Sequence, residues 1–328
     1  MRVEPVALLA AALGAGFGRL ALEARLAKLE QRLDLEGELE VIYEDYEDGS
    51  KLRHLLKTPF GERFELRFAA RNKEWRSGLA VRAQGWLLES GDALGSIQGD
   101  LVLSDDEQGL MLADGGTGSG TLAYDMPNTT GAQRTLAILV NFQDDTSQPM
   151  TREAANTLVF ETTNNFYRQS SFGQTWLSGR TFDWVTVPYN KSTCVDGMLI
   201  AAEADKAVAA AGGDLSGYNR KVYMFPRNAC SWSGLALVNE NPSMAWINGS
   251  FNLKAVGHEL GHNLGLRHAH ALDCDVSATG NTCTRLPYGD AADLMGNVRT
   301  GDFSSYAKER MGWLNDGVSP PILTADRS

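Results

Sequence analysis

The chain has 328 residues, which is long enough for two domains or one elaborated domain. Hydrophobic residues make up 43% of it and charged residues 22%, which is ordinary for a soluble globular protein. A formal net charge of −11 argues against a surface for nucleic acid or for anionic membranes, and a solvated acidic surface explains it.

The N-terminal stretch is expected to be a signal and pro-segment. Residues 6–17 are apolar but too short to span a bilayer, and they resemble the hydrophobic core of a secretory signal with small residues at 14–16. Arg2 is the only basic residue ahead of them. Residues 19–35 repeat leucine and alanine at helical spacing, so residues 1–35 are interpreted as a signal or pro-segment ending in an amphipathic helix.

Residues 36–112 change to short alternating runs separated by turn-like sequences, which predicts a small all-β, barrel-like domain. This stretch has no cysteine and only one histidine, His54, so we expect a non-catalytic module. It is either an inhibitory pro-domain removed on activation or an accessory domain that is retained. The Gly-rich residues 113–132 are interpreted as a linker.

Residues 133–328 are predicted to form the catalytic domain. The predicted strands are 134–142, a strand and hairpin within 173–188, 221–226 and 244–250, and the predicted helices are 151–167 and 198–211. Thr151 can cap the first helix, and Gly212 and Gly213 end the second. This order describes an α/β layer packed over a cleft.

The run HELGHNLGLRH at 258–268 carries the chemistry. His258 and His262 are four residues apart, so on a helix they share one face and can reach one zinc ion. Glu259 is placed to contact a zinc-activated water rather than the metal. Four of the five histidines of the chain lie within thirteen residues, which a solvated helix face does not explain.

A third ligand is expected from the residues that follow the helix. Gly265 can turn the chain, which lets His268 return to the metal and leaves a fourth position open for water or substrate. An open position distinguishes a catalytic zinc site from a structural one. His270 is interpreted as an exposed or neighbouring residue without a ligand role.

The four cysteines suit two disulfides. Cys274 and Cys283 flank a short polar loop and form the natural pair, which leaves Cys194 with Cys230. A cysteine zinc site is the alternative, but no C-x2-C spacing occurs. Disulfides and a signal segment both indicate an oxidising, extracellular location.

The chain resembles the metzincin clan of zinc metallopeptidases. Its HELGHNLGLRH run matches the clan signature HExxHxxGxxH, and YGDAADLMGN at 288–297 resembles the Met-turn, with Met295 as a packing floor beneath the metal. With FSSYAKERMGWL at 303–314, the sequence looks most like the gametolysin family of secreted endopeptidases. The resemblance covers about residues 134–315 and implies an α+β (α/β-type) metzincin-like catalytic domain with a twisted sheet and a zinc-binding active-site helix.

Several features depart from related families. Ala269 follows the third histidine, where several metzincin families carry a polar or acidic residue. Asn297 stands where astacin-like and serralysin-like members have a tyrosine. The N-terminal module has no cysteine, which excludes latency through a thiol on zinc. Asp100, in a Gly-Asp pair, faintly resembles the latency aspartate of astacin pro-segments, but a strand turn is the preferred interpretation.

The predicted function is that of a secreted, monomeric zinc metalloendopeptidase made as a zymogen. One catalytic Zn²⁺ lowers the pKa of its water toward ~7 and polarises the scissile carbonyl, and Glu259 is the general base. Protein or peptide substrates are expected to lie extended along an edge strand formed by residues 231–238. The predicted substrate contacts are Ser233, Gly234, Leu235, Phe303 and Tyr306.

Two alternatives stay open. A clan with two histidines and a downstream glutamate as third ligand would have to use Glu309, which the Gly265 and His268 arrangement makes unnecessary. A catalytically inactive binding or adhesion module would keep the fold. The intact Glu259 argues against it, because that glutamate is not needed to bind zinc.

Overall fold

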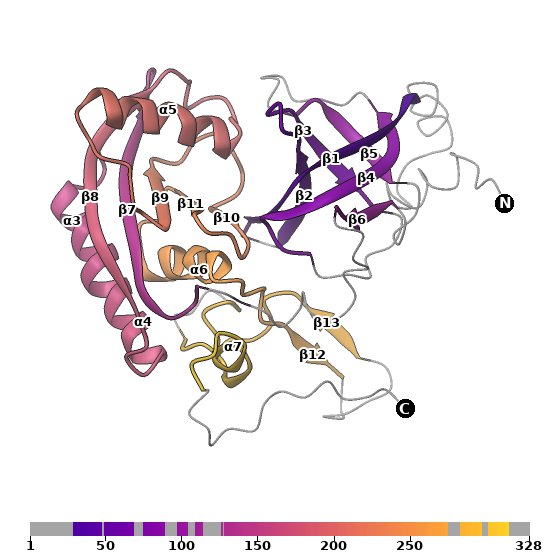
Figure 1. Ribbon diagram of the computed structural model, residues 1–328. Coiled ribbons are helices and arrows are strands. Elements are labelled where there is room, and N and C mark those ends of the chain that lie inside the picture. Colours follow the sequence, from indigo (N-terminus) through magenta and orange to yellow (C-terminus); the bar gives the residue numbers. More distant parts are fainter. Residues whose placement is uncertain are drawn as a thin grey trace. The chain divides into compact units, whose positions relative to one another are not determined.

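The structure is a computed structural model that describes residues 29–47, 49–68, 75–88, 97–103, 109–113, 126, 128–274, 283–296 and 301–314. The chain forms two compact units, one of Met1–Ile42 and Leu52–Tyr124 and one of Tyr43–Lys51 and Asp125–Ser328 (Figure 1). The predicted signal and most of the predicted linker lie outside the described residues. The mixed, sheet-rich fold predicted from the sequence is confirmed.

The first unit is built from strands. They are β1 (Leu29–Asp45), β2 (Ser50–Lys57), β3 (Arg63–Arg67), β4 (Leu79–Leu88), β5 (Gly99–Leu103) and β6 (Leu110–Leu112), of which residues 43–51 at the ends of β1 and β2 belong to the second unit. Their order is β6-β4-β5-β3-β2-β1, and β4 also pairs with β1. The β3–β5 pair is parallel, so the arrangement is mixed rather than antiparallel throughout.

The predicted helix over residues 19–35 is wrong where it can be compared. Residues 29–35 form the start of β1, antiparallel to β4. Leu33 and Leu35 are half-buried and alternate with exposed Arg32 and Asp34, so the period-two pattern of a strand decides this stretch.

Asp100 is held within the first unit. Its carboxylate lies 3.1 Å from the Arg67 guanidinium, and the neighbouring Arg63 and Glu40 pair at 2.8 Å. These side chains are mostly buried, so each charge has an opposite partner in place of water. Asp100 is therefore a structural ion-pair residue of β5.

The second unit has a sheet of five strands in the order β10-β11-β9-β7-β8. They are β7 (Gly131–Phe142), β8 (Thr175–Val187), β9 (Arg220–Phe225), β10 (Gly234–Leu237) and β11 (Ser243–Asn248). Four strands run parallel, and β10 is antiparallel to β11. The strand β7, between β9 and β8, is buried over most of its length, which explains its continuous apolar sequence.

The hairpin predicted within residues 173–188 does not form. Residues 175–187 are one strand, β8, that runs parallel to β7. Gly179, near the start of this strand, lies against β7, since a Cβ atom there would be 1.8 Å from the Thr135 carbonyl oxygen. Gly179 is needed because the two backbones approach closely.

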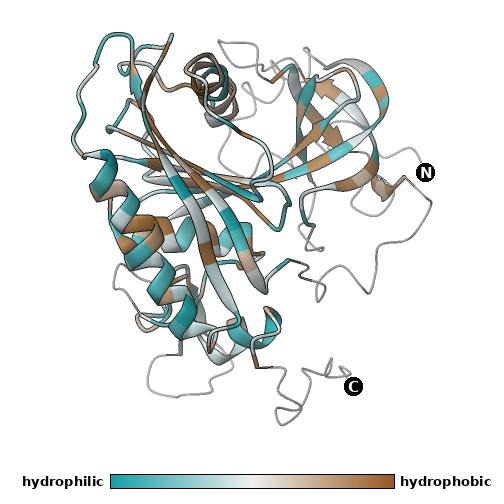
Figure 2. Cartoon of the chain, turned by 60° about the vertical axis from the view of Figure 1, so that its left-hand side comes forward, coloured by the Kyte–Doolittle hydropathy of each residue, from teal (hydrophilic) through white to brown (hydrophobic). Residues whose placement is uncertain are grey.

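The two helices predicted at 151–167 and 198–211 are confirmed, with small shifts of their ends. Residues 152–170 are a continuous helical run made of α3 (Arg152–Thr157), η1 (Leu158–Thr163) and α4 (Asn164–Ser170), and the Thr151 hydroxyl accepts the Ala154 N–H as expected. This run bears alternating hydrophilic and hydrophobic bands (Figure 2). The helix α5 (Gly197–Ala210) is capped by Asp196 and ends before Gly212.

The helix α6 (Leu253–Asn263) lies against β10 and β11 (Figure 1). Below it, the short β12 (Ala271–Asp273), β13 (Thr284–Leu286) and α7 (Ser305–Arg310) complete the unit. Tyr167 joins the helical run to α6, since its buried hydroxyl donates to the Gly257 carbonyl at 2.8 Å. Phe303 and Trp313 pack around Tyr167, so α6 rests on an aromatic core.

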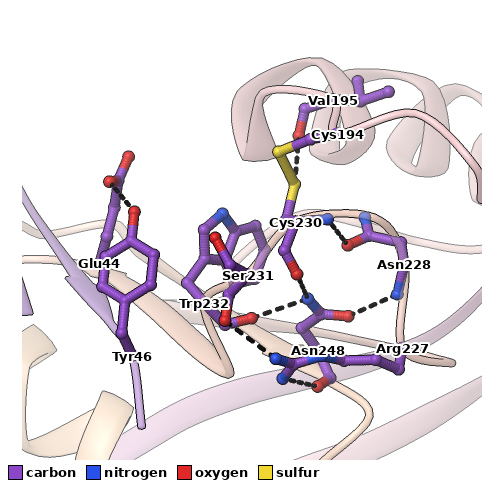
Figure 3. The surroundings of a disulfide bond; sticks show 10 residues. All are labelled: Glu44, Tyr46, Cys194, Val195, Arg227, Asn228, Cys230, Ser231, Trp232 and Asn248. Carbon is purple, nitrogen blue, oxygen red and sulfur yellow. Dashed lines mark hydrogen bonds between the residues drawn. A yellow bond between two sulfur atoms is a disulfide. The ribbon is translucent and has the colours of Figure 1, made fainter. Parts of the chain in front are cut away.

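Both predicted disulfides are present, Cys194–Cys230 and Cys274–Cys283. The first anchors the loop that leads into β10 (Figure 3). The Asn248 side chain, at the end of β11, donates to two carbonyls of that loop, those of Cys230 at 3.2 Å and Trp232 at 2.8 Å. The loop is therefore fixed both covalently and by buried hydrogen bonds, directly before the strand that borders α6.

Replacing Gly179 should destabilise the second unit. In Gly179→Ala the new methyl group collides with the Thr135 carbonyl in a backbone region that alanine rarely adopts, so we expect a loss of about 3 kcal/mol or more. Urea unfolding followed by tryptophan fluorescence measures it. Ser178→Ala, on the same strand, is the control and should stay within about 1 kcal/mol; equal effects of the two substitutions would contradict the close approach.

Candidate metal centre

The helix α6 presents two histidines on its buried face. Asn252 caps its first turn by accepting the Ala255 N–H at 3.0 Å. His258 and His262 follow one turn apart, 4% and 0% exposed. Because the helix lies against the sheet and the aromatic core, both rings are held on one side of it.

The helix ends in the way that the third histidine requires. The Leu266 N–H donates to the Gly261 carbonyl at 3.0 Å and the Gly265 N–H to the His262 carbonyl at 2.8 Å, which together form a Schellman motif. Gly265 has a φ of 100°, a region that favours glycine. The turn reverses the chain, and His268 comes back to lie beside His262 with its Nε2 3.1 Å from the Nε2 of His262.

Four side chains converge on one point. The Nε2 atoms of His258 and His262 lie 3.0 and 3.2 Å from Oδ2 of Asp45, and Nε2 of His268 lies 2.9 Å from its Oδ1. All four side chains are buried. Asp45 belongs to the same compact unit as the histidines.

The other nitrogen of each imidazole already has a partner. Nδ1 of His258 lies 2.9 Å from the Leu294 carbonyl, and Nδ1 of His262 lies 2.8 Å from the Leu266 carbonyl. Each Nδ1 therefore carries the proton, which leaves its Nε2 as a lone pair facing the common point. His268 is oriented by Ser50, whose Oγ lies 3.1 Å from its Nδ1.

This donor set fits a zinc ion. Ligand atoms about 2.0–2.1 Å from a tetrahedral zinc lie about 3.3 Å from one another, close to the 2.9 to 3.2 Å between the Asp45 oxygens and the three Nε2 atoms. Burial lowers the pKa of His262, and that of His268 to about 3, so both rings are neutral as metal ligands must be. Burial acts to raise the pKa of Asp45, but the neighbouring imidazoles, His258 first, hold it well below its usual range.

Asp45 was not found by sequence reasoning. It lies in the acidic run YEDYEDGS at residues 43–50, more than two hundred positions before the motif, and no spacing connects the two. The sequence offers one indication, which is that the acidic stretch begins at the end of a strand. In the structure, residues 41–45 of that strand are buried. An isolated buried carboxylate is costly, so Asp45 in that stretch required a partner.

Two tyrosines surround the same point. The Tyr43 ring stacks on His262 with ring centroids 4.5 Å apart. Tyr288 lies against His268 at 4.1 Å, and its hydroxyl donates to Oδ1 of Asp45 at 2.5 Å. Burial and the charge of Asp45 raise the pKa of Tyr288, so its hydroxyl is a donor at pH 7. Related families carry a tyrosine after Met295, where this chain has Asn297, whereas Tyr288 precedes Met295 in the chain.

Glu259 is fully buried beside the histidines. Burial and the charge of Asp45 raise its pKa well above the usual range. Gly234 of β10 lies directly against it, since a Cβ atom at residue 234 would be 1.8 Å from Oε1 of Glu259. The glycine therefore leaves the space in which the carboxylate lies.

The Met-turn lies under α6. A Cβ atom on Gly261 would lie 2.5 Å from Sδ of Met295, so the glycine within the motif lets the helix rest on the methionine. The Met295 carbonyl accepts the Ala269 N–H at 2.9 Å, which ties the turn to the segment of the third histidine. Asp293 orders the turn by accepting the N–H groups of Met295 and Ser304. Met295 therefore packs directly against α6, and its role as a floor beneath the metal stays a prediction.

The predicted substrate contacts divide into two groups. Ser233, Gly234 and Leu235 lie at the start of β10, beside Glu259. Phe303 is different: it is 3% exposed and packs in the aromatic core with Tyr167, so it is a core residue and cannot line a substrate pocket. Tyr306 is 56% exposed on α7 and accepts a hydrogen bond from Arg310, and its role in substrate binding stays a prediction.

The alternative ligands lie outside the cluster. Within the described residues, the group that could hold a metal ion consists of Asp45, His258, His262 and His268. Neither His270 nor Glu309 belongs to it. His270 is half-buried, and burial lowers its pKa.

Comparisons with known proteins give one family match. The family model described as gametolysin peptidase M11 matches residues 134–326. No curated protein matches the chain significantly.

Two of the matching solved structures show only distant likeness. One, titled as a chaperone-substrate complex, has 16% identity and a TM-score of 0.34 over 70% of this chain, which spans only 37% of that one. The other, metalloproteinase-II from Bacteroides fragilis, has 12% identity and a TM-score of 0.30, covering 89% of this chain and 94% of that one. Both scores are too low to support a statement about fold or function.

The turn at Gly265 should matter for metal binding beyond its effect on stability. Gly265→Ala forces a side chain into the left-handed region, at a cost of about 1–2 kcal/mol, and displaces His268. Gly212→Ala meets the same strain at φ 77° with open space around it. We expect similar losses of unfolding free energy, but weaker zinc binding only in Gly265→Ala; competition with a chromogenic chelator measures the affinity. Equal zinc affinities would show that the turn does not place His268.

Proposed function

Because the chain belongs to the gametolysin peptidase family, we propose that it is a secreted zinc-dependent endopeptidase of the metzincin type that hydrolyses peptide bonds in proteins. The observation that carries this proposal is the convergence of three buried Nε2 atoms beside the carboxylate of Glu259. Histidine nitrogens with a neighbouring glutamate are the donor set of zinc peptidases. His258, His262 and His268 are the proposed ligands.

The chemistry divides between the metal and Glu259. Zinc, when bound, supplies a Lewis acid that activates a water molecule and polarises the scissile carbonyl. Glu259 accepts the proton of the attacking water on its carboxylate and returns it to the leaving amine. Burial raises the pKa of the Glu259 carboxyl above its usual range, so this group takes up a proton more readily than a free glutamate.

The substrate backbone is proposed to bind along β10. The strand lies beside Glu259 and is antiparallel to β11, so an extended peptide along its other edge would continue the sheet by main-chain hydrogen bonds. Ser233, Gly234 and Leu235 supply those bonds. Gly234 also keeps the peptide close to Glu259, because it has no side chain to hold the two apart.

Secretion and domain roles are part of the proposal. Two disulfides suit an oxidising compartment. Among the described residues, no helix has the length and apolar character needed to cross a membrane. We propose that residues 1–35 contain the signal, that residues 36–112 form a β-rich pro- or accessory domain joined by the linker 113–132, and that residues 133–328 form the monomeric peptidase domain.

A second function is favoured by one observation. Asp45 completes a set of four buried protein ligands, and a closed set of four is typical of a structural zinc site. In that case the chain would be a binding or adhesion module with a metal that only stabilises the fold. The buried Glu259 favours the peptidase, because a structural site has no use for a second buried carboxyl group beside the metal.

Glu259→Gln should abolish hydrolysis and keep the zinc. The amide has nearly the same shape but cannot take up the water proton, so turnover of an unfolded protein substrate should fall at least about a hundredfold. Metal content measured by atomic emission should stay at one zinc per chain, and a chelator should abolish the hydrolysis by the unaltered enzyme. A variant that turned over at the unaltered rate would sink the assignment of the base.

The two neighbouring histidines should behave differently. His268→Ala removes an Nε2 atom from the cluster and should lower zinc affinity by more than about tenfold. His270→Ala is the matched control and should keep the affinity, since His270 lies outside the cluster. Equilibrium dialysis against zinc measures both. Loss of zinc from the His270 variant, with binding intact in the His268 variant, would reassign the third ligand.

A further inference from the structure

We infer that Asp45 is the fourth ligand of the metal and that residues 43–51 hold the centre closed, which makes this form of the chain latent. The inference rests on the proposed function, since it concerns the same metal and the same substrate strand. It adds a ligand that the motif does not contain and a closed state that slows hydrolysis by the full chain.

The carboxylate of Asp45 occupies the position that the reaction needs. Its two oxygens lie 2.9 to 3.2 Å from the Nε2 atoms of His258, His262 and His268, so one carboxylate faces all three ligands at once. A catalytic zinc site keeps its fourth position for water or for the substrate carbonyl. With Asp45 in place, neither can enter.

The backbone of Asp45 occupies the substrate strand as well. Its carbonyl accepts the Ser233 N–H at 2.7 Å and the Ser233 hydroxyl at 3.2 Å. Ser233 directly precedes β10, where the substrate backbone is proposed to pair. The chain therefore fills both parts of the site, the metal position with a side chain and the edge of the sheet with main chain.

Further contacts hold the segment on either side of Asp45. Ahead of it, the Tyr43 ring stacks on His262 at 4.5 Å. Behind it, the Ser50 hydroxyl lies 3.1 Å from Nδ1 of His268, and the Tyr288 hydroxyl lies 2.5 Å from Asp45 and 3.2 Å from the Gly49 carbonyl. Because the attachments span residues 43 to 50, Asp45 is not a side chain that has entered the site alone. Opening the centre requires the whole segment to move away.

Glu47 belongs to the same segment but lies outside the cluster of metal-binding side chains. Its side chain is exposed, whereas Asp45, two positions earlier, is buried against the histidines. The two residues carry the same charge on the same segment. They therefore provide a matched pair of substitutions that separates the ligand from the general acidity of the segment.

The test uses the full chain with Glu259→Gln, which prevents turnover, loaded with cobalt(II) in place of zinc. Acetohydroxamate, a small metal-binding probe, is titrated by calorimetry, and the visible spectrum reports the ligands of the cobalt. Asp45→Ala, Asp45→Asn and Glu47→Ala are compared in this background. Asp45→Asn preserves the shape of the side chain, which keeps the test valid if the alanine variant folds poorly.

We expect Asp45→Ala to bind acetohydroxamate at least about tenfold more tightly and to change the cobalt spectrum, because an occupied site lowers apparent affinity by the fraction of molecules that are open. Asp45→Asn should change in the same direction, and Glu47→Ala should match the parent. Equal affinities and identical spectra for the parent and both Asp45 variants would overturn the inference.

Hydrolysis with Glu259 intact separates the inference from the proposed function. The Asp45→Ala chain should cleave an unfolded protein at least about tenfold faster than the unaltered chain. If Asp45→Ala opens the site to the probe but cleaves nothing, Asp45 is upheld as a ligand and the peptidase proposal fails. If the unaltered chain cleaves as fast as Asp45→Ala, latency is overturned and the peptidase proposal stands.

Discussion

The structure of the second unit depends on three imidazole rings held with their Nε2 atoms facing one point. Each ring is fixed by a bond to its other nitrogen, and two of those bonds go to main-chain carbonyls, of Leu294 and Leu266. A main-chain carbonyl can only accept a hydrogen bond, so the ring nitrogen that faces it must carry the proton. The helix α6, the Schellman turn at Gly265 and the Met-turn can all be understood as the means of holding these rings, since each supplies a ring, an acceptor or a support.

Sequence reasoning found the parts of this centre that are close in the chain. The spacing of His258 and His262 depends only on the helix period, and Gly265 predicts the turn that returns His268. The Met-turn and both disulfides were also predicted from local patterns. Asp45 and Tyr288 were missed because their positions depend on tertiary structure. A single buried aspartate in an acidic run gives no periodic signal, and only its contacts in the fold distinguish it from Glu47.

The errors in the fold have similar causes. Residues 29–35 carry leucines that suit a helix or a strand, and pairing with β4 decides for the strand. A hairpin was predicted within residues 173–188, but residues 175–187 form one strand beside β7, and the close approach of the two backbones explains Gly179. Phe303 looked like a pocket wall beside the motif and is instead part of the core beneath α6. In each case a contact with residues far away in the sequence, and not the local residue pattern, determined the structure that formed.

The central claim is that one metal ion is bound by three histidines of the motif and by Asp45. Diffraction from crystals of the zinc-loaded full chain at the zinc absorption edge tests it most directly. The predicted result is one anomalous peak within about 2.0–2.2 Å of the Nε2 atoms of His258, His262 and His268 and of an Asp45 oxygen. A peak bound by other residues, or no zinc peak between the three histidines, would contradict the account.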